Sequence, residues 1–205
     1  MPVTQDRREL LLSVAAELFS TRPYDEVTTT EITKRAGVAY GLLAHHFGNK
    51  RGLYLATLEF AASQLRGVRD APLAGDTPLE QLRTGLTREI EYLDANQNVY
   101  LALVHGNLGA DKDARATIEQ LRSEAAMPIL DRLGATQPLH PVLRSAIRGW
   151  IGYCSEIVVD HIQHHDVAVD ELVELLIATL TASLAGAQQL APEIALDLDA
   201  IGEPA

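Results

Sequence analysis

The sequence contains a single cysteine, Cys154, among 205 residues. An internal disulfide is therefore excluded, and the composition is typical of a protein in a reducing cytoplasm. No apolar run approaches the roughly 18–20 residues that span a bilayer, and the N-terminus has no apolar stretch typical of a signal peptide. We therefore expect a cytoplasmic protein without a membrane partner. Aromatic residues are also few, whereas Ala and Leu are abundant, which favours helices.

Positive charge is scarce, because the net charge of the chain is −11. Residues 1–51 carry seven Lys and Arg against six Asp and Glu, whereas residues 52–205 carry ten against twenty-two. An acidic surface repels phosphate, so only the first segment is a plausible nucleic-acid contact. Catalytic patterns are missing too. We find no paired carboxylates, Ser/His/Asp set or phosphate-binding loop, and we expect neither enzyme activity nor a cofactor.

The first segment begins with two predicted helices. Apolar residues at helical spacing indicate an amphipathic helix over residues 5–21. Thr28 and Glu31 form a capping box, in which each side chain bonds the backbone of the other residue. Val27 and Ile32 stand where a hydrophobic staple belongs. The second helix is therefore predicted to begin at Thr28.

A short third helix is predicted to follow a turn. Gly37 can take the positive φ that a tight turn requires. The next helix, residues 39–47, is too short to persist without packing. We expect Leu42, Leu43 and Phe47 to point inward, which leaves Tyr40, Gly41, Ala44, His45 and His46 for the outer face and its margins. Two short helices hinged at a glycine, residues 28–47, are the layout of a helix-turn-helix, whose second helix enters the DNA major groove.

Lys50 and Arg51 stand just after this motif, behind Asn49, the predicted N-cap of a long fourth helix. Cations in a first helical turn oppose the helix dipole, so stability alone does not favour them there. A phosphate at this helix end would reverse that penalty, because the backbone N–H groups and both cations would face it. A solvated basic pair is the alternative.

These residues resemble the N-terminal region of the TetR family of bacterial transcriptional regulators over about fifty contiguous positions. The resemblance rests on Ala15, Ala16, Leu18, Phe19, Tyr24, Thr28 to Thr30, Ile32, Ala36 to Val38, Gly41, Leu43, Phe47, Lys50 and Leu53. It implies that the third helix reads the major groove and that the fourth leads into a divergent helical domain. It further implies a homodimer, most simply a repressor, that binds a near-palindromic operator and is released by a small-molecule effector.

The chain also departs from this family pattern. The Ser or Thr that usually opens the recognition helix is Ala39, the Thr after Gly41 is Leu42, and the usual phosphate-binding aromatic is Ala44. A side-chain cap of about 1 kcal/mol is therefore absent. Phosphate contacts should rest on the threonines, histidines and Lys50, and base contact on Tyr40. The predicted DNA-binding residues are Thr28, Thr30, Ala39, Tyr40, Gly41, His45, His46 and Lys50.

The remainder is predicted to be entirely helical, which gives an all-α chain of about nine helices. After the fourth helix we expect helices at 78–95, 98–106, 112–133, 140–165 and 169–190, with Pro128 bending or splitting its helix. The predicted domains are residues 1–50, which bind DNA, and residues 51–192, which bind the effector and dimerise. An acidic, loosely ordered tail covers residues 193–205.

Two segments, Ala146 to Ile162 and Leu172 to Leu184, are apolar on more than one face. A second subunit is the simplest cover for such helices, although a central position in one domain would also explain them. Polar tips among apolar positions favour an effector pocket. Its candidate residues are Tyr92, Tyr100, His105, Asn107, Arg148, Trp150 and Tyr153. Arg148, as a buried cation, would need an anionic partner such as Glu156, Glu124 or the ligand.

His161, His164 and His165 share a helix face and could contribute to a metal site. Histidine is equally favoured at a helix C-terminus, and paired cysteines are missing, so we expect no metal there. Cys154 is expected to be a packing residue. Two other functions remain open for the chain as a whole. One is a helical enzyme or small-molecule-binding protein whose first segment only packs, and the other is a partner-binding helical scaffold.

Overall fold

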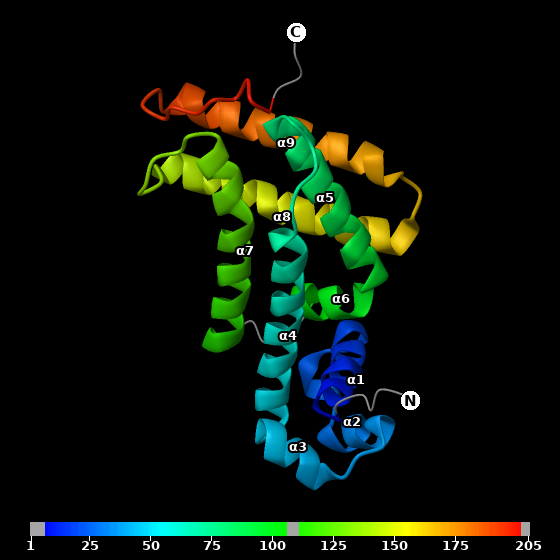
Figure 1. The fold of residues 1–205 in the computed structure, drawn as a ribbon. Helices are drawn as coiled ribbons and strands as arrows, with labels where there is room; N and C mark the ends of the chain where they lie inside the picture. The colour runs from blue at the N-terminus through cyan, green and yellow to red at the C-terminus, as the bar shows by residue number, and fades with distance from the viewer. Residues whose placement is uncertain (1–6, 106–110, 202–205) are drawn as a thin grey trace. The chain divides into compact units, whose positions relative to one another are not determined.

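The computed structural model describes residues 7–105 and 111–201, and Figure 1 shows them as helices joined by short loops. No strand occurs in these residues, so the predicted all-α class is confirmed. None of the helices in these ranges has both the length and the apolarity that a bilayer crossing demands. The helices are α1 (Arg7–Thr21), α2 (Thr29–Ala36), α3 (Tyr40–Phe47), α4 (Lys50–Asp70), α5 (Pro78–Ala95), α6 (Gln97–His105), α7 (Lys112–Arg132), α8 (Pro141–His164) and α9 (Val169–Leu190), with a 3₁₀ turn, η1 (Tyr24–Glu26), after α1.

Contacts divide the chain into two units, one of which is Met1–Arg66 with Asn96–Glu119. In this unit α1 packs along α6 and against α2, and α3 packs on both α1 and α2. Its core is built from side chains that are almost fully buried: Leu11, Leu12, Phe19, Ile32, Leu43, Leu53 and Tyr54. The unit extends beyond residues 1–50 because α6 covers α1. The predicted functional boundary at residue 50 stays a prediction.

Local signals in the sequence fix where these helices begin. The Thr28 hydroxyl accepts the Glu31 N–H at 3.2 Å, and the Asn49 side chain accepts the Gly52 N–H at 3.0 Å, so both predicted N-caps are confirmed. The predicted capping box is only half right. The Glu31 carboxylate binds the Arg22 guanidinium at 2.6 Å rather than reaching back to the backbone.

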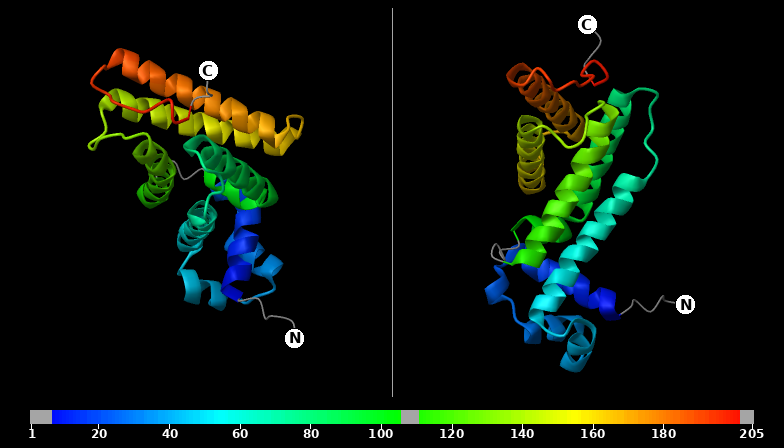
Figure 2. Two further views of the ribbon diagram at one scale, coloured as in Figure 1. Left: turned by 45° about the horizontal axis from the view of Figure 1, so that its top comes forward. Right: turned by 90° about the vertical axis from the view of Figure 1, so that its left-hand side faces the viewer.

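The second unit is Gly67–Ala95 with Gln120–Ala205. In it α8 and α9 pack along each other, as Figure 2 shows, and α5 packs on both. The Trp150 indole N–H donates to the Leu176 carbonyl at 2.9 Å, which ties the middle of α8 to α9. Thr77 and Glu80 form a complete capping box at the start of α5, where the predicted helix begins with Pro78.

Pro128 does not split its helix, because α7 is continuous from Lys112 to Arg132, and the alternative, a bend at Pro128, stays a prediction. One expectation about this unit needs correction. Residues 193–201 are not loose. Ile194 and Ile201 are buried, and the Asp197 N–H donates to the Leu133 carbonyl at 3.0 Å. Apolar residues among the acidic ones therefore anchor this segment to the unit.

Candidate nucleic-acid interface

The connection between α2 and α3 is a tight turn at Gly37. This residue ends α2 with φ 64° and ψ 32°, the left-handed conformation that favours glycine. The Val38 N–H then donates to the Thr33 carbonyl at 3.0 Å, which closes the turn. α3 follows behind Ala39, which has extended backbone and no side-chain cap, as predicted. The predicted helix-turn-helix geometry over residues 28–47 is therefore present.

Packing on one side holds α3 in place. Leu43 is fully buried, and Leu42 and Phe47 are half-buried, so the three residues predicted to point inward do so to different degrees. The Arg8 guanidinium lies 5.5 Å from the centroid of the Phe47 ring. Because the helix has only two turns, these contacts rather than its own hydrogen bonds must fix its orientation.

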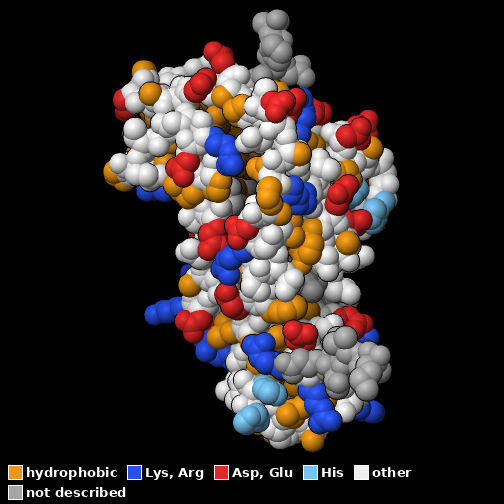
Figure 3. Space-filling view, viewed as in Figure 1, with side chains coloured by type: hydrophobic (Ala, Val, Ile, Leu, Met, Phe, Trp, Pro, Cys, Tyr) orange, Lys and Arg blue, Asp and Glu red, His pale blue; other side chains and the backbone are white. Residues whose placement is uncertain are grey.

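The other side of α3 is exposed. Tyr40 is 55% exposed, and Gly41, His45 and His46 are also exposed. In Figure 3, histidine side chains lie at the surface beside Lys and Arg side chains in the part of the chain that contains α3. Ala39, Thr28 and Thr30 are exposed as well, although the Thr28 hydroxyl is engaged as the cap of α2. Each of these predicted contact residues of α2 and α3 is therefore accessible.

Gly41 has no structural requirement for glycine. Its φ is not in the left-handed range, and a Cβ built on it would meet no atom within 4 Å. Glycine inside a helix costs roughly 0.5–1 kcal/mol relative to alanine. No described neighbour therefore requires glycine here, and the missing side chain leaves the surface of α3 open at this position.

Lys50, the first residue of α4, lies against an aromatic cluster. Its ammonium is 4.2 Å from the centroid of the Tyr24 ring and 3.5 Å from the Asp25 carbonyl oxygen. Tyr24 in turn stacks on Phe19 and meets Tyr54 edge to face. Among the described side chains, no carboxylate pairs with Lys50. Its charge therefore remains available to an anion at the start of α4.

Arg51 does not share this role, contrary to the expectation for a basic pair. Its guanidinium binds the Asp111 carboxylate at 2.6 and 3.0 Å and the Asp113 carboxylate at 2.6 Å. These hydrogen bonds raise the pKa of Arg51 and lower that of Asp111. The contact links positions sixty residues apart, so no local pattern in the sequence could have revealed it.

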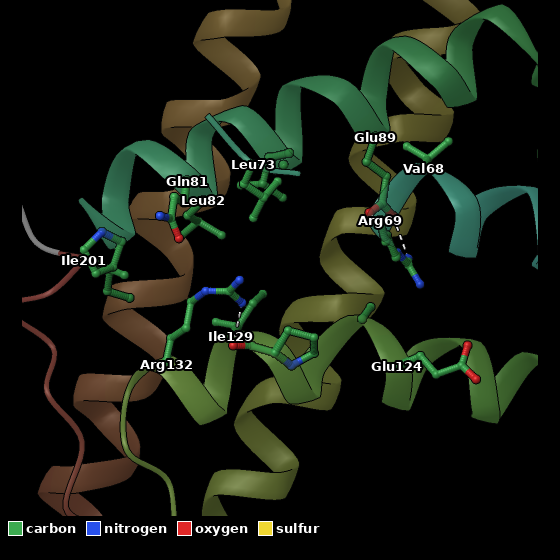
Figure 4. Close-up of a pocket in the computed structure, with 15 residues that line it drawn as sticks. Val68, Arg69, Leu73, Gln81, Leu82, Glu89, Glu124, Ile129, Arg132 and Ile201 are labelled. Atoms are coloured by element: carbon green, nitrogen blue, oxygen red, sulfur yellow. Dashed lines mark hydrogen bonds and ion pairs between the residues drawn. The ribbon is translucent and has the colours of Figure 1, made fainter. Parts of the chain in front are cut away.

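A separate cavity lies within the second unit, between the end of α4, α5, α7 and Ile201 (Figure 4). Its volume is about 150 Å³. Most of its lining is apolar, and its charged side chains are Arg69, Glu89, Glu124 and Arg132. Arg69 is already paired with Glu89 at 2.6 and 2.9 Å. Arg132 bonds only the Pro128 carbonyl in the contacts that the structure resolves, at 3.0 Å.

This cavity contains none of the residues predicted for an effector pocket. Trp150 is buried with its N–H satisfied, and Arg148 is exposed, so the expected buried cation is wrong. Tyr92 and Tyr153 are half-buried, and Tyr100 is buried in the other unit. The His105 side chain and Asn107 lie outside the described residues. The apolar periodicity of α8 could indicate which face of the helix is buried. It could not distinguish a residue in the core from one that lines a cavity.

The histidines at the end of α8 do not act as one set. His164 lies against Asp160, whereas His165 lies 2.8 Å from Asp94 of α5 and beside His161. Cys154 is half-buried, and burial raises the pKa of its thiol, consistent with a packing role.

Comparison with known proteins agrees with this architecture. Residues 11–57 match the bacterial regulatory proteins of the tetR family, and residues 78–183 match the tetracyclin repressor-like C-terminal domain. A tetR-family transcriptional regulator from Streptomyces coelicolor has a similar structure. It is 27% identical with a TM-score of 0.75, and the match covers 98% of this chain and 88% of that one.

Two curated relatives match over shorter segments. The transcriptional activator FasR of Mycolicibacterium smegmatis is 29% identical over 56% of this chain and 52% of its own length. The transcriptional regulator BetI of Stenotrophomonas maltophilia is 34% identical over 38% of this chain and 40% of its own length. The aligned segments thus span about half of these relatives or less. Because the two family matches together cover most of the chain, this protein belongs to the TetR family of bacterial regulatory proteins.

Proposed function

We propose that this chain is a transcriptional regulator that binds duplex DNA through the exposed face of α3. The proposal is supported by the exposure of this face, which carries Tyr40, Gly41, His45 and His46, and by the open space that a Cβ on Gly41 would meet. A helix-turn-helix places the N-terminal residues of its second helix at base edges. Tyr40, Gly41 and the preceding Ala39 occupy that end of α3. Tyr40 contacts bases, and Gly41 lets the helix approach the groove closely.

Phosphate contacts surround this face. Lys50 begins α4, where backbone N–H groups and the positive end of the helix dipole also attract an anion. Thr28, Thr30, His45 and His46 offer further donors at exposed positions. Such contacts fix the position of the protein on the duplex without reading its sequence. Since the partner is chromosomal DNA, the protein acts in the cytoplasm.

The regulator acts as a homodimer that binds a near-palindromic operator. One face of α9 carries Leu175, Ala178 and Ala182, which are exposed, and one face of α8 carries Gly149 and Gly152. A Cβ at either glycine would meet nothing within 4 Å. Small residues let helices of a second copy approach closely, and four helices, two from each subunit, make the interface.

Light scattering tests this arrangement. We expect a mass twice the 22.3 kDa of one chain, and Ala182→Glu should give monomers. Ser63→Glu, a charge added at an exposed position of α4, is the matched control and should stay dimeric. A monomeric native protein, or dimers unaffected by Ala182→Glu, would exclude this interface.

An effector binds in the cavity of the second unit and releases the DNA, so the regulator acts as a repressor. The apolar lining and the Arg132 guanidinium suit a small apolar molecule with an acidic group. By linkage, DNA must then weaken effector binding by the factor by which effector weakens DNA binding. The relative FasR is named an activator, so a transcription assay with the selected operator decides the direction of control.

The proposed DNA binding is tested by selecting bound fragments from a pool of random duplexes. We expect enrichment of an inverted repeat. Its half-sites should be separated by one helical turn of DNA, about 34–36 Å, or by a multiple of that length. Binding must weaken steeply as salt rises. A pool that remains random after repeated rounds would exclude sequence-specific DNA binding.

A further inference from the structure

We propose that Asp94, His161 and His165 form a binding site for a divalent transition metal, with Zn²⁺ as the reference ion. One ligand atom from each of the three side chains lies within 4.8 Å of the other two. The site lies within the second unit, where the last turn of α5 meets the C-terminal end of α8. It goes beyond the proposed regulation of transcription and does not depend on it.

Two features of His161 and His165 favour a role as metal ligands over a role in packing alone. His161 is only 7% exposed, and its Nδ1 has no hydrogen-bond partner among the described residues. A buried nitrogen without a partner is unfavourable, because it has lost its hydrogen bonds to water. His165 follows α8 with φ 50°, the only positive φ outside glycine in the described residues. This conformation brings its ring to 5.0 Å from that of His161.

The Asp94 carboxylate also lies where a bound cation would be favourable. Asp94 stands in the last turn of α5, where the negative end of the helix dipole disfavours a carboxylate. His161 and His165 stand at the corresponding end of α8. A bound cation would therefore interact favourably with both helix ends and with Asp94. In Figure 3, histidine and acidic side chains lie close together at the surface near the α8–α9 turn.

The distances fit a small tetrahedral ion. Zn–N and Zn–O bonds of about 2.0–2.2 Å place the ligand atoms of a tetrahedral site roughly 3.3 Å apart. His165 Nε2 and Asp94 Oδ1 are 2.8 Å apart. The other two separations do not exceed 4.8 Å, so side-chain rotation would have to draw the His161 nitrogen toward the other two atoms to surround one ion. Binding would displace the proton between His165 and Asp94, and water would complete the fourth position.

The chemistry of the donors selects the class of metal. Two imidazoles and one carboxylate suit Zn²⁺, Co²⁺, Ni²⁺ or Cu²⁺, whereas Mg²⁺ and Ca²⁺ prefer a full set of oxygen ligands. A metal ion bound here would link α5 to α8, and it would bind the folded chain but not the unfolded one. It would therefore raise the melting temperature in proportion to the logarithm of metal concentration.

The test uses tag-free, chelator-treated protein titrated with Zn²⁺ by calorimetry and with Co²⁺ by visible absorption. We expect one ion per chain and the intense absorption of tetrahedral Co²⁺. Asp94→Asn and His165→Asn should each weaken Zn²⁺ binding by more than about 10-fold. Asn tolerates the left-handed conformation of residue 165, and both positions are solvent-accessible, so these variants should fold.

His164→Asn is the matched control. His164 stands on the same helix end but lies against Asp160 rather than in the cluster. This variant should bind Zn²⁺ as the native protein does. Failure of the native protein to bind one ion at micromolar concentration would overturn the proposal and leave His165–Asp94 as an ion pair. So would an equal loss of affinity in His164→Asn and His165→Asn, which indicates nonspecific histidine binding.

Discussion

The Lys50 ammonium lies 4.2 Å from the centroid of the Tyr24 ring, at the first residue of α4. A cation–π contact holds the side chain without neutralising its charge. Arg51, the next residue, is neutralised by Asp111 and Asp113. Adjacent cations with nearly the same local sequence therefore have different roles, and only Lys50 is available for phosphate.

Lys50→Ala should weaken binding to all duplexes alike and reduce the slope of log affinity against log salt by about 1 per subunit. The loss of a phosphate contact causes both effects. Arg144→Ala removes the same charge from an exposed position of α8 and should leave the slope unchanged. Fluorescence anisotropy at several salt concentrations measures these slopes. An unchanged slope in Lys50→Ala would show that this ammonium does not contact phosphate.

Gly41→Leu should lower operator affinity by about 10-fold, equivalent to 1.4 kcal/mol, without lowering stability. A Cβ on Gly41 meets no atom of the chain within 4 Å, so the added side chain should extend toward a molecule bound over α3. Gly67→Leu is the matched control, because Gly67 is also helical and exposed with open space. If both substitutions left affinity unchanged, α3 would not approach DNA at this residue.

Tyr54 should set an alkaline limit to stability. Burial raises its pKa to about 12, whereas the pKa in an unfolded chain is about 10. The unfolded state therefore loses the proton first, so this contribution is complete below about pH 10 and is lost as pH rises through 12. Tyr54→Phe should remove this loss. It also removes a buried hydroxyl without a partner, so stability at neutral pH should not fall.

Urea unfolding between pH 8 and 11.5 measures this effect. Tyr40→Phe, at an exposed position of α3, should keep the native pH profile. If Tyr54→Phe lost stability with pH as steeply as the native protein does, another group would be responsible.

Ala125→Phe should fill part of the cavity and reduce binding of 1-anilinonaphthalene-8-sulfonate, an anionic apolar fluorophore, by about 10-fold. Ala125 and Arg132 both line the cavity, and the Arg132 side chain is exposed, so it can meet the sulfonate of the fluorophore. Arg132→Gln should also weaken binding, whereas Arg144→Gln should not. Circular dichroism must confirm that each variant is folded. Equal fluorophore affinity in all of them would place its binding elsewhere.

The sequence predicted local structure well and contacts between distant residues poorly. Thr28, Gly37 and Asn49 act within a few residues of themselves, so their roles could be read from spacing alone. The partners of Arg51 and His165 come from other elements, and no pattern near either residue reveals them. The cavity depends on how α5, α7 and Ile201 pack. Apolar periodicity specifies which face is buried but not where packing leaves a gap.

Site-directed cleavage of bound DNA would show whether α3 of this chain lies in the major groove. Tyr40→Cys, combined with Cys154→Ala, provides one exposed thiol for an attached iron chelate. With α3 in the groove, we expect strand cleavage inside each half-site of the selected operator, on the major-groove side. The same chelate at position 144 of α8 should cleave little. Equal cleavage from the two positions, or none from position 40, would show that α3 does not enter the groove.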